Sequence, residues 1–488
     1  MPQSATKSTW RQRTLAVLGT AALVMSLAAA PAMAIDFTID PTTSEAKAVP
    51  EDLGSCPTLT SEPRAVEAWF NTDDMEYRGY LDANDQSPWS YANKLAQIIC
   101  GAKANSKIMI GMYFIRAIGT TARPESDAEI IWRAMDYVHS KRNVTIGMVL
   151  DGGSITPASA KSNIVKRLVD TGIAKIYWCY NGCFNTNKSS VFPYAINHEK
   201  FVTMSDTIWA NDDTTTHPAV FSSSGQFARS QVRTYWQEAT LIYDDVLLYR
   251  NFADRYANMK TCSGSRTSTD YINNCKGGKF VSTTNDGVTM KKQRGIWVDL
   301  MYRHYTDSGR GTTVSYSPQP VYDTSGEVIN DYYSSQFDDV DCIVDSKIRV
   351  AMYRLTVTRA ENFVKTMVSL KSRGCDVKVL LSQSGGATTI SKKALSILKK
   401  GGASSMVKCT KIPIHTKMIL ITPSTSNAGR AMFGTANMTT SGLRYSEEHV
   451  ITMDSRRADD STSEDIRRAI GVYQAGWNEL NQGSKACK

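Results

Sequence analysis

The chain has 488 residues, of which 42% are hydrophobic, 21% charged and 9% aromatic, and its formal net charge is +9 at pH 7. This composition is too apolar for a disordered chain, and 31 glycines and 15 prolines exclude a collagen-like or proline-rich architecture. At this length, two domains or one duplicated domain are expected. The mild basic excess tolerates anionic partners without requiring one.

The first 34 residues have the three-part pattern of a secretory signal peptide. A basic start at 7–13 precedes an apolar stretch at 15–30, and the small-residue sequence Ala-Met-Ala follows at 32–34. A membrane anchor is the alternative, but the apolar stretch is short and ends at Pro31. We therefore predict cleavage after residue 34 and secretion of the remaining chain.

Ten cysteines follow the predicted cleavage site. In an oxidising compartment an even number of cysteines suggests disulfides. Cys179 with Cys183 and Cys262 with Cys275 are the nearest pairs in sequence, and we predict that these two pairs are bonded. A zinc site is the alternative, but no pair has the CxxC spacing and none lies in a tight histidine cluster, so no metal is expected.

An eight-residue segment occurs twice in the chain. Residues 106–113 (SKIMIGMY) and 346–353 (SKIRVAMY) share five of eight residues, and both are typical of a strand. Each copy precedes apolar residues at helical spacing and then a β-branched run, at 144–150 and at 377–381. The order strand, helix, strand occurs twice, which predicts two similar α/β halves.

Each repeat continues into an apolar, strand-like run that contains His-x-Lys. The first run holds His198 and Lys200, and the second holds His415 and Lys417. Residues two apart on a strand project to the same face, so each histidine and its lysine should point together. A single histidine on an apolar strand is usually a satisfied core residue, but the matched pair favours catalysis. The other four histidines lack a matched partner, and we expect structural or surface roles for them: His139, His217, His304 and His449.

A short polar turn follows each His-x-Lys. The second turn, Gly-Thr-Ala-Asn at 434–437, contains Thr435 and Asn437, and the first, Ser-Ser-Gly-Gln at 223–226, contains Ser224 and Gln226. Acidic residues then open another strand-like run in each half, Glu238 in the first and Glu447 with Glu448 in the second. Helical segments at 244–260 and 464–480 close the two halves.

We predict a first half at 35–260, a connecting insert at 261–333 and a second half at 334–488. The insert is rich in Ser, Thr, Gly and Asn, but its segment 295–301 is able to pack, which disfavours a flexible linker. The first half also has 16 more residues before its His-x-Lys than the second. The aromatic residues of that longer loop either meet substrate or pack internally.

These motifs resemble those of the phospholipase D superfamily, whose signature is HxKxxxxD followed by a GSxN-like turn, twice per active site. The resemblance covers about residues 100–480, and it implies two α/β/α sandwich halves related by pseudo-twofold symmetry around one shared site. The sequence departs from the pattern at four positions. Ser205 and Thr422 occupy the aspartate positions, Thr435 replaces serine, and Gln226 stands where asparagine is expected.

The resemblance also implies a covalent phosphohistidine intermediate and no cofactor or metal. By this analogy His198 is the nucleophile and His415 the general acid, although the reverse order stays open. Both imidazoles must then reach one phosphate, so we expect them roughly 5 to 8 Å apart. Glu238 and either Glu447 or Glu448 are expected to hydrogen-bond the opposite histidine. The side chains expected to hold the phosphoryl oxygens are those of Lys200, Lys417, Ser224, Gln226, Thr435 and Asn437.

Three functions fit this sequence. The first is a secreted phospholipase D-like enzyme that cleaves or transfers a phospholipid headgroup, which would require transient contact with a membrane surface. The second is a secreted nuclease or other phosphodiesterase, and the third is an inactive homologue that binds phosphate. The weak net charge and the lack of a dense Lys/Arg stripe favour lipid over nucleic acid. We expect a monomer.

Overall fold

The computed structural model describes a large part of the chain between residues 56 and 487. The expected signal peptide and the predicted disulfide partner Cys275 lie outside the described residues. Among the described residues, no helix has both the length and the apolar character needed to cross a membrane. The described residues are 56, 64–71, 77–78, 88–89, 91–116, 127–152, 164–179, 182–184, 196–208, 215–228, 235–263, 279–285, 288–294, 309–317, 332–382, 392–410, 413–444 and 446–487.

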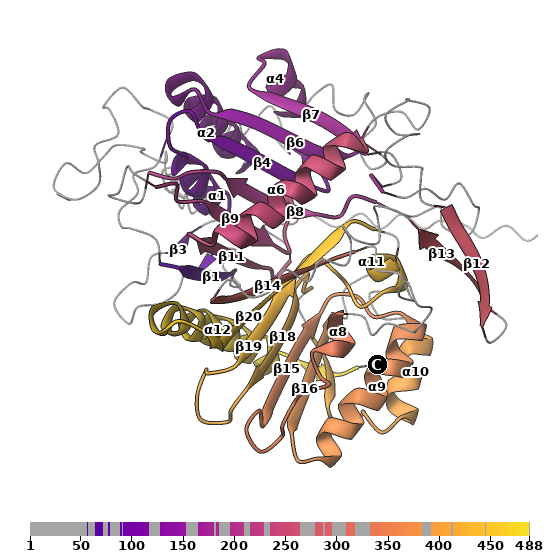
Figure 1. Cartoon of the computed structure of the whole chain (residues 1–488). Helices are drawn as coiled ribbons and strands as arrows, with labels where there is room; N and C mark the ends of the chain where they lie inside the picture. Colours follow the sequence, from indigo (N-terminus) through magenta and orange to yellow (C-terminus); the bar gives the residue numbers. More distant parts are fainter. Residues whose placement is uncertain are drawn as a thin grey trace, which may run out of the picture. The chain divides into compact units, whose positions relative to one another are not determined.

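A nine-stranded sheet forms the framework of the N-terminal half (Figure 1). Its long central strands are rich in Ile, Val and Met, as expected for strands that are covered by helices. In spatial order the strands are β3 (Pro88–Trp89), β2 (Tyr77–Arg78), β1 (Val66–Asn71), β11 (Glu238–Tyr243), β9 (Ala219–Ser223), β8 (Lys200–Met204), β4 (Lys107–Met112), β6 (Thr145–Asp151) and β7 (Ala174–Cys179).

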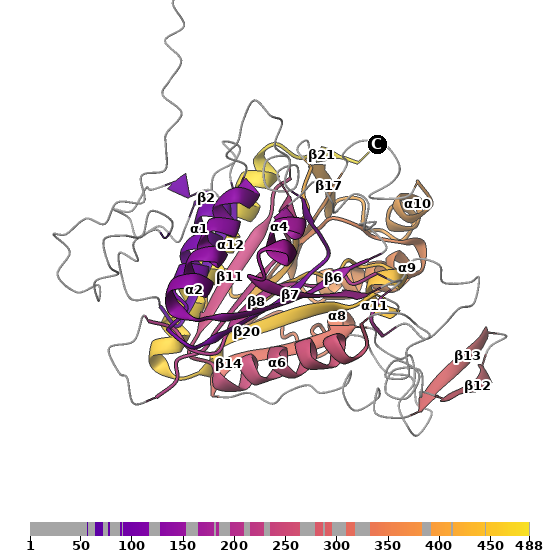
Figure 2. The ribbon, with the colours of Figure 1, turned by 90° about the horizontal axis from the view of Figure 1, so that it is seen from above.

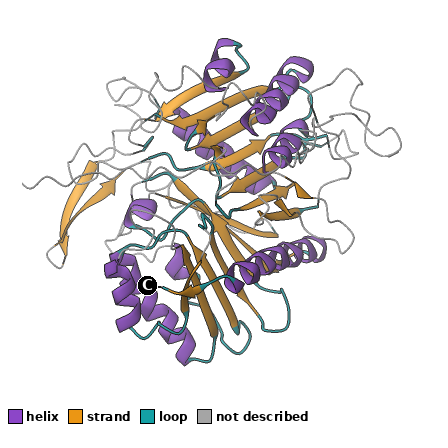
Figure 3. Cartoon of the chain, turned by 180° about the vertical axis from the view of Figure 1, so that it is seen from behind, coloured by secondary structure: helices purple, strands orange, loops and turns teal. Residues whose placement is uncertain are grey.

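An eight-stranded sheet forms the framework of the C-terminal half, and Figure 3 shows both sheets from behind. In spatial order its strands are β14 (Arg310–Ser317), β20 (Glu448–Ala458), β19 (Arg430–Gly434), β18 (Lys417–Thr422), β15 (Lys347–Met352), β16 (Asp376–Ser382), β17 (Val407–Thr410) and β21 (Lys485–Ala486). Two small sheets complete the described strands, β5 (Ile115–Arg116) with β10 (Phe227–Ala228) and β12 (Lys279–Asn285) with β13 (Val288–Arg294).

The two sheets repeat one topology. In the first, β4 pairs parallel with β6 and antiparallel with β8, and in the second β15 pairs parallel with β16 and antiparallel with β18. The order β1-β11-β9-β8-β4-β6-β7 corresponds strand by strand to β14-β20-β19-β18-β15-β16-β17. The duplicated eight-residue segment therefore supplies the central strand of each half, and the predicted fold of two similar α/β halves is confirmed.

Helices pack against both sheets. In the first half α1 packs on α2, and in the second α9 packs on α10. The helix that closes each half also contacts the other half, because α6 packs on β4 and β14 while α12 packs on β20 and β1. Figure 2 shows α6 alongside β14. The helices are α1 (Tyr91–Cys100), α2 (Asp127–Arg142), α4 (Ile164–Asp170), α6 (Val246–Thr261), α8 (Tyr332–Ser335), α9 (Val357–Ser372), α10 (Lys392–Lys400), α11 (Thr440–Arg444) and α12 (Asp460–Gln482).

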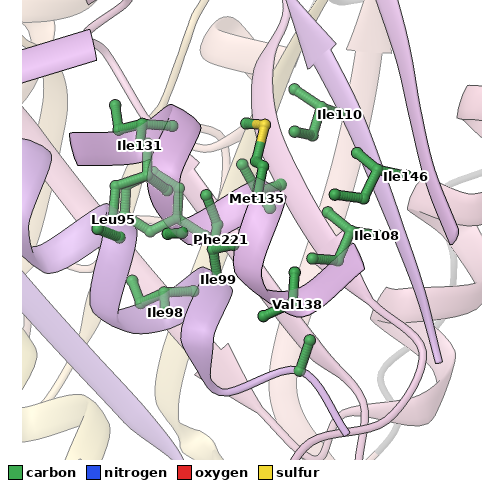
Figure 4. Packing of buried hydrophobic residues seen from close by; sticks show 14 of the residues in the cluster. Leu95, Ile98, Ile99, Ile108, Ile110, Ile131, Met135, Val138, Ile146 and Phe221 are labelled. Atoms are coloured by element: carbon green, nitrogen blue, oxygen red, sulfur yellow. The ribbon is translucent and has the colours of Figure 1, made fainter. Parts of the chain in front are cut away.

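Apolar spacing explains the core of the first half (Figure 4). Along α2, Ile131, Met135 and Val138 lie on one face of the helix and are buried, as the helical spacing of the sequence predicts. Ile108 and Ile110, two apart on β4, enter the same cluster. A separate cluster combines residues of both halves, which include Phe201, Phe252, Phe433, Tyr473 and Trp477. The two halves thus share one hydrophobic core in addition to their own cores.

Disulfides join segments that are near and far apart in sequence. The predicted bond between Cys179 and Cys183 is confirmed. Cys262 is also in a disulfide, although its predicted partner lies outside the described residues. Three further bonds join Cys56 to Cys100, Cys342 to Cys375 and Cys409 to Cys487. Sequence proximity could not find these three, because the bonded residues are 44, 33 and 78 positions apart.

The second sheet begins inside the range 261–333 that was expected to be a connecting insert. There β14 pairs antiparallel with β20, in the same way that β1 pairs with β11 in the first half. The boundaries of the two halves stay a prediction, but β14 acts structurally as the first strand of the second sheet.

The two disulfides of very different span should differ in their contribution to stability. In the chain-entropy model, replacing Cys409 and Cys487 by serine releases a 78-residue loop and should cost about 4.5 kcal/mol, whereas replacing Cys179 and Cys183, which are four residues apart, should cost about 2 kcal/mol. Urea unfolding of the two double variants checks this expectation. A larger loss for the short loop would contradict it.

Candidate active site

The two histidines of the duplicated motif face each other. The ring centroids of His198 and His415 are 6.4 Å apart, with an angle of 63° between the ring planes. This separation agrees with the spacing expected for two imidazoles that act on one phosphate. Both histidines are buried, with 7% of His198 and 4% of His415 exposed, which limits access by water.

Each histidine is held in place by the main chain of the opposite half. The backbone N–H of His198 donates to the carbonyl oxygen of Glu447 at 2.9 Å, and that of His415 donates to the carbonyl oxygen of Trp236 at 2.7 Å. These bonds belong to two parallel bridges, Asn197 with Glu447 and Trp236 with Ile414. The residue before each His-x-Lys strand is therefore paired across the interface, and one site requires both halves.

Each lysine contacts the histidine of its own motif. Lys200 is the first residue of β8 and its Nζ donates to the carbonyl oxygen of His198 at 2.7 Å. Lys417 is the first residue of β18, its Nζ donates to the carbonyl oxygen of His415, and it lies 3.0 Å from Nδ1 of the same ring. Each histidine and its lysine are thus neighbours, as the two-residue spacing on a strand predicts.

Two tyrosines that the motifs did not single out also line the site. Tyr113 and Tyr353 end the duplicated eight-residue segments, and their ring centroids lie 5.2 Å and 4.6 Å from His198 and His415. Each ring also faces the lysine of its own half, with Nζ of Lys200 5.8 Å and Nζ of Lys417 5.2 Å from the ring centroid. The signal was present in the sequence, because both tyrosines are among the identities of the repeat.

The acidic partners of the two histidines differ. Nδ1 of His198 lies 2.8 Å from Oε2 of Glu448, so the second half provides a carboxylate to the first histidine. Nδ1 of His415 instead lies 2.9 Å from the carbonyl oxygen of Ser224. Glu238, the expected partner of His415, accepts from the backbone N–H of Lys417 at 3.2 Å. The predicted bond from a histidine to a glutamate of the opposite half is therefore found for His198 and not for His415.

Glu447, the alternative to Glu448, has a different environment. Its side chain is buried, and Oε1 accepts from the backbone N–H of Phe184 at 2.8 Å. Successive residues of an extended chain alternate in direction, so only one of two adjacent glutamates can point at His198. Glu448 has that direction.

The two polar turns occupy equivalent positions in the halves. The backbone N–H of Ser224 donates to the carbonyl oxygen of Glu238, and that of Thr435 donates to the carbonyl oxygen of His449. Their hydroxyls accept from the N–H of those same two residues, at 3.1 Å and 3.0 Å. In this structure both hydroxyls thus support the strand pairing next to the site.

Two residues after each hydroxyl, each turn carries an amide side chain, Gln226 in the first and Asn437 in the second. Gln226 and Asn437 are both buried, and their side-chain amide oxygens have no hydrogen-bond partner among the described residues. Of the two residues at the family's aspartate position, Ser205 accepts from the N–H of Lys107 at 2.9 Å, which ties β8 to β4. Thr422 is buried at the end of β18.

Burial shifts the pKa of both histidines and of Glu448. The pKa of His198 is held well below its usual value by burial and then by the charges of Lys200 and Lys417, and that of His415 by burial and the same two lysines. Burial raises the pKa of Glu448 well above its usual value, against the opposing effect of both lysines. Both imidazoles are therefore neutral near pH 7.

Burial also acts on the lysines and on the neighbouring acids. It lowers the pKa of Lys200 to about 7, although three nearby glutamates oppose the change. Burial, followed by the charge of Lys200, lowers the pKa of Lys417 well below its usual value. The pKa of Glu447 is raised to about 7 and that of Glu238 is raised, in both cases by burial first. A bound anion would favour the charged lysines again.

The arrangement is chemically suited to transfer of a phosphoryl group. Both histidines bond through Nδ1, which leaves Nε2 of each ring to act on a substrate. Among the described residues, no group of three or more His, Cys, Asp or Glu side chains could hold a metal ion. One neutral imidazole can attack phosphorus, the other can deliver a proton, and the two lysines can stabilise negative charge.

Comparison with known proteins agrees with this geometry. Residues 344–469 match the family model described as the PLD-like domain of cardiolipin synthase. This part of the second half is therefore similar to a domain of the phospholipase D superfamily. No curated protein sequence matches the chain.

A search of solved structures finds matches at low sequence identity. Phosphatidylserine synthase from Haemophilus influenzae has a TM-score of 0.50 and 10% identity, over 82% of this chain and 85% of that one. Yeast tyrosyl-DNA phosphodiesterase has a TM-score of 0.42 and 10% identity, over 74% and 87% of the two chains. Nuc from Salmonella typhimurium has a TM-score of 0.26 and 18% identity, over 36% and 97%.

The lowered pKa of Lys200 should be measurable as a dependence of stability on pH. In the folded chain the pKa is about 7 instead of 10.5, so between these values the unfolded chain binds one more proton at this residue. Relative to a Lys200→Met variant, the unfolding free energy of the native chain should therefore rise with pH, by about 1.4 kcal/mol per unit between pH 7 and 9.

Denaturant unfolding at several pH values measures this slope. The exposed Lys408 provides a matched control, and Lys408→Met should leave the slope of the native chain unchanged. Equal slopes for the native chain and Lys200→Met would contradict the assignment.

Proposed function

We propose that the chain is a secreted phosphodiesterase that hydrolyses or transfers the headgroup of a phospholipid, with His198 as the nucleophile. The observation that carries the assignment of roles is the asymmetry of the two histidines. A carboxylate of Glu448 faces Nδ1 of His198, whereas a neutral carbonyl of Ser224 faces Nδ1 of His415. A carboxylate stabilises positive charge on the ring that has attacked phosphorus, which favours His198 as the nucleophile.

The first step would form a phosphohistidine. Nε2 of His198 attacks phosphorus, the bond from phosphorus to the leaving oxygen breaks, and that oxygen takes a proton from Nε2 of His415. For this step Nδ1 of His198 must carry a proton and donate it to ionised Glu448. Charged Lys200 and Lys417 oppose the effect of burial on the pKa of Glu448 and so favour its ionised form. His415 must enter protonated, and an anionic substrate beside it opposes the effect of burial on its pKa.

The second step would release the product. His415, now neutral, takes a proton from water as the water oxygen attacks phosphorus, and the bond from phosphorus to Nε2 of His198 breaks. If an alcohol replaces water, the same step transfers the phosphoryl group to that alcohol. Lys200 and Lys417, with the amides of Gln226 and Asn437, are proposed to hold the phosphoryl oxygens through both steps.

A phospholipid is the favoured substrate for two reasons. The matching family model is that of a domain of cardiolipin synthase, and the chain has no dense Lys/Arg stripe of the kind that binds nucleic acid. Secretion is supported by the four disulfides among the described residues, because such bonds form in oxidising compartments.

An assay with three substrates tests the proposed function. One preparation of the mature chain is incubated with phosphatidylcholine vesicles, DNA and bis(p-nitrophenyl) phosphate, without and with EDTA. Headgroup release that survives EDTA is expected. Cleavage of DNA alone would replace the lipid by a nucleic acid as substrate, and loss of all activity in EDTA would contradict the histidine mechanism.

Replacing the two histidines one at a time should separate their roles. His198→Ala should abolish turnover of every substrate and formation of a covalent phosphoenzyme. His415→Ala should slow a substrate with an alcohol leaving group much more than one with nitrophenol, because nitrophenolate leaves without a proton. Rates on both substrates, and labelling with a ³²P-substrate quenched in alkaline SDS, measure these effects.

His139→Ala is the matched control, because His139 lies on α2 and bonds to the carbonyl oxygen of Val144, away from the site. It should retain native rates. If His415→Ala abolished labelling while His198→Ala kept it, the assigned order of the two histidines would be reversed.

A further inference from the structure

A second histidine–glutamate pair lies directly behind the pair of His198 and Glu448. It is made by the next residue of each segment: Nδ1 of His449 lies 2.5 Å from Oε2 of Glu199. The dipeptides His198-Glu199 and Glu448-His449 thus make two histidine–glutamate contacts with each other. The contact of His198 with Glu448 faces the site, and that of His449 with Glu199 is fully buried, with both residues 0% exposed. His449 had been expected to be a structural or surface residue.

The second pair exists on one side of the molecule only. Strand pairing makes Glu238 the equivalent of His449. The N–H of Ser224 donates to the carbonyl oxygen of Glu238, and the N–H of Thr435 donates to that of His449. The equivalent of Glu199 is Thr416, which follows His415 and donates to the carbonyl oxygen of Trp236 at 3.2 Å. The additional pair therefore accompanies the histidine that faces a carboxylate, His198.

Both members of the buried pair are anchored from further elements. Arg255 on α6 contacts Oε1 of Glu199 through Nε at 3.0 Å and through Nη2 at 3.0 Å, and it also donates to the carbonyl oxygen of Ser317 at 2.6 Å. On the opposite side, Nε2 of His449 lies 2.7 Å from Oγ of Ser222 on β9. Burial opposes ionisation of Glu199, but His449 and Arg255 outweigh it and lower its pKa.

The side chains of Ser222, His449 and Glu199 are hydrogen-bonded in the order of a hydrolase triad, but substrate cannot reach them. All three side chains are 0% exposed. A nucleophilic role would require a path from solvent to Ser222. The chain of hydrogen bonds must therefore act through its neighbours.

We propose that Glu199 and His449 are positioning residues that hold Glu448 against Nδ1 of His198 and thereby fix the tautomer of His198 with a free lone pair on Nε2. The physical reason is adjacency. Glu199 follows His198 and His449 follows Glu448, so the hydrogen bond between Glu199 and His449 sets the separation of the two backbones at His198 and Glu448. The main-chain bond from His198 to Glu447 alone would allow the two side chains to turn apart.

This proposal rests on the proposed role of His198, but its test does not need a known substrate. The mature chain is labelled with ¹⁵N-histidine, and the Nδ1 and Nε2 resonances of its six histidines are recorded, with His198 assigned by its loss in His198→Gln. In the native chain His198 should carry its proton on Nδ1 near pH 7. In Glu199→Gln the Nδ1–H fraction of His198 should fall, and Glu199→Asp should restore it in part.

Steady-state kinetics on a substrate that the native chain cleaves give a second, independent measurement. Glu199→Gln should lower kcat about tenfold to a hundredfold with little change in KM, the usual effect of removing a group that orients a catalytic side chain. Ser222→Ala removes one hydrogen bond and a small group, so the tautomer of His198 can still be measured in this variant if Glu199→Gln does not fold. It should shift the His198 resonances in the same direction by a smaller amount.

Thr416→Val is the matched control for the tautomer, because Thr416 has the equivalent position beside His415. It should leave the Nδ1–H fraction of His198 unchanged. Native resonances of His198 in both Glu199→Gln and Ser222→Ala would overturn the proposal. An inactive native chain that still shows the predicted change in tautomer would count against the proposed function and not against the positioning pair.

Discussion

The site depends on a reciprocal pairing of main chains between the two halves. His198 and Ile196 bond to the backbone of Glu447, while His415 and the carbonyl of Pro413 bond to the backbone of Trp236. Neither sheet can place its own histidine without the segment that opens a strand of the other sheet. The shared core and the contacts of α6 and α12 with the opposite half keep these segments together. A duplicated fold thus yields one site instead of two.

The same geometry places charges where water cannot solvate them. Lys200 and Lys417 are buried beside one another and among several glutamates, and burial is the main cause of their lowered pKa values. Such a cluster is unfavourable without a ligand, but it is already arranged for an anion. In the proposed function, a phosphodiester that enters the site supplies the missing negative charge.

The sequence was sufficient for the framework and for the reacting groups. The repeat of 106–113 at 346–353 placed the central strands, and the paired His-x-Lys motifs placed the two imidazoles, because both signals are local and occur twice. The helices that close each half were also found, at 244–260 against the observed Val246–Thr261 and at 464–480 against Asp460–Gln482. Periodicity fixes such elements well and their ends less well.

The parts that sequence did not reveal depend on pairing across large distances. Whether Glu447 or Glu448 faces His198 follows from the direction of one extended segment, and that direction is set by a bridge to residue 197 in the other half. The bond of Glu199 with His449 joins residues 250 positions apart. The disulfide of Cys409 with Cys487 likewise needs the pairing of β17 with β21, which no local pattern indicates.

A crystal structure of the mature chain with orthovanadate, a mimic of the phosphoryl group in transfer, tests the central claim most directly. The account predicts one vanadate between the halves, bonded to Nε2 of His198, with an oxygen facing Nε2 of His415 and with Glu448 still at Nδ1 of His198. A vanadate held by the residues of one half alone, or one bonded to His415 with Glu448 turned away from His198, would contradict the account.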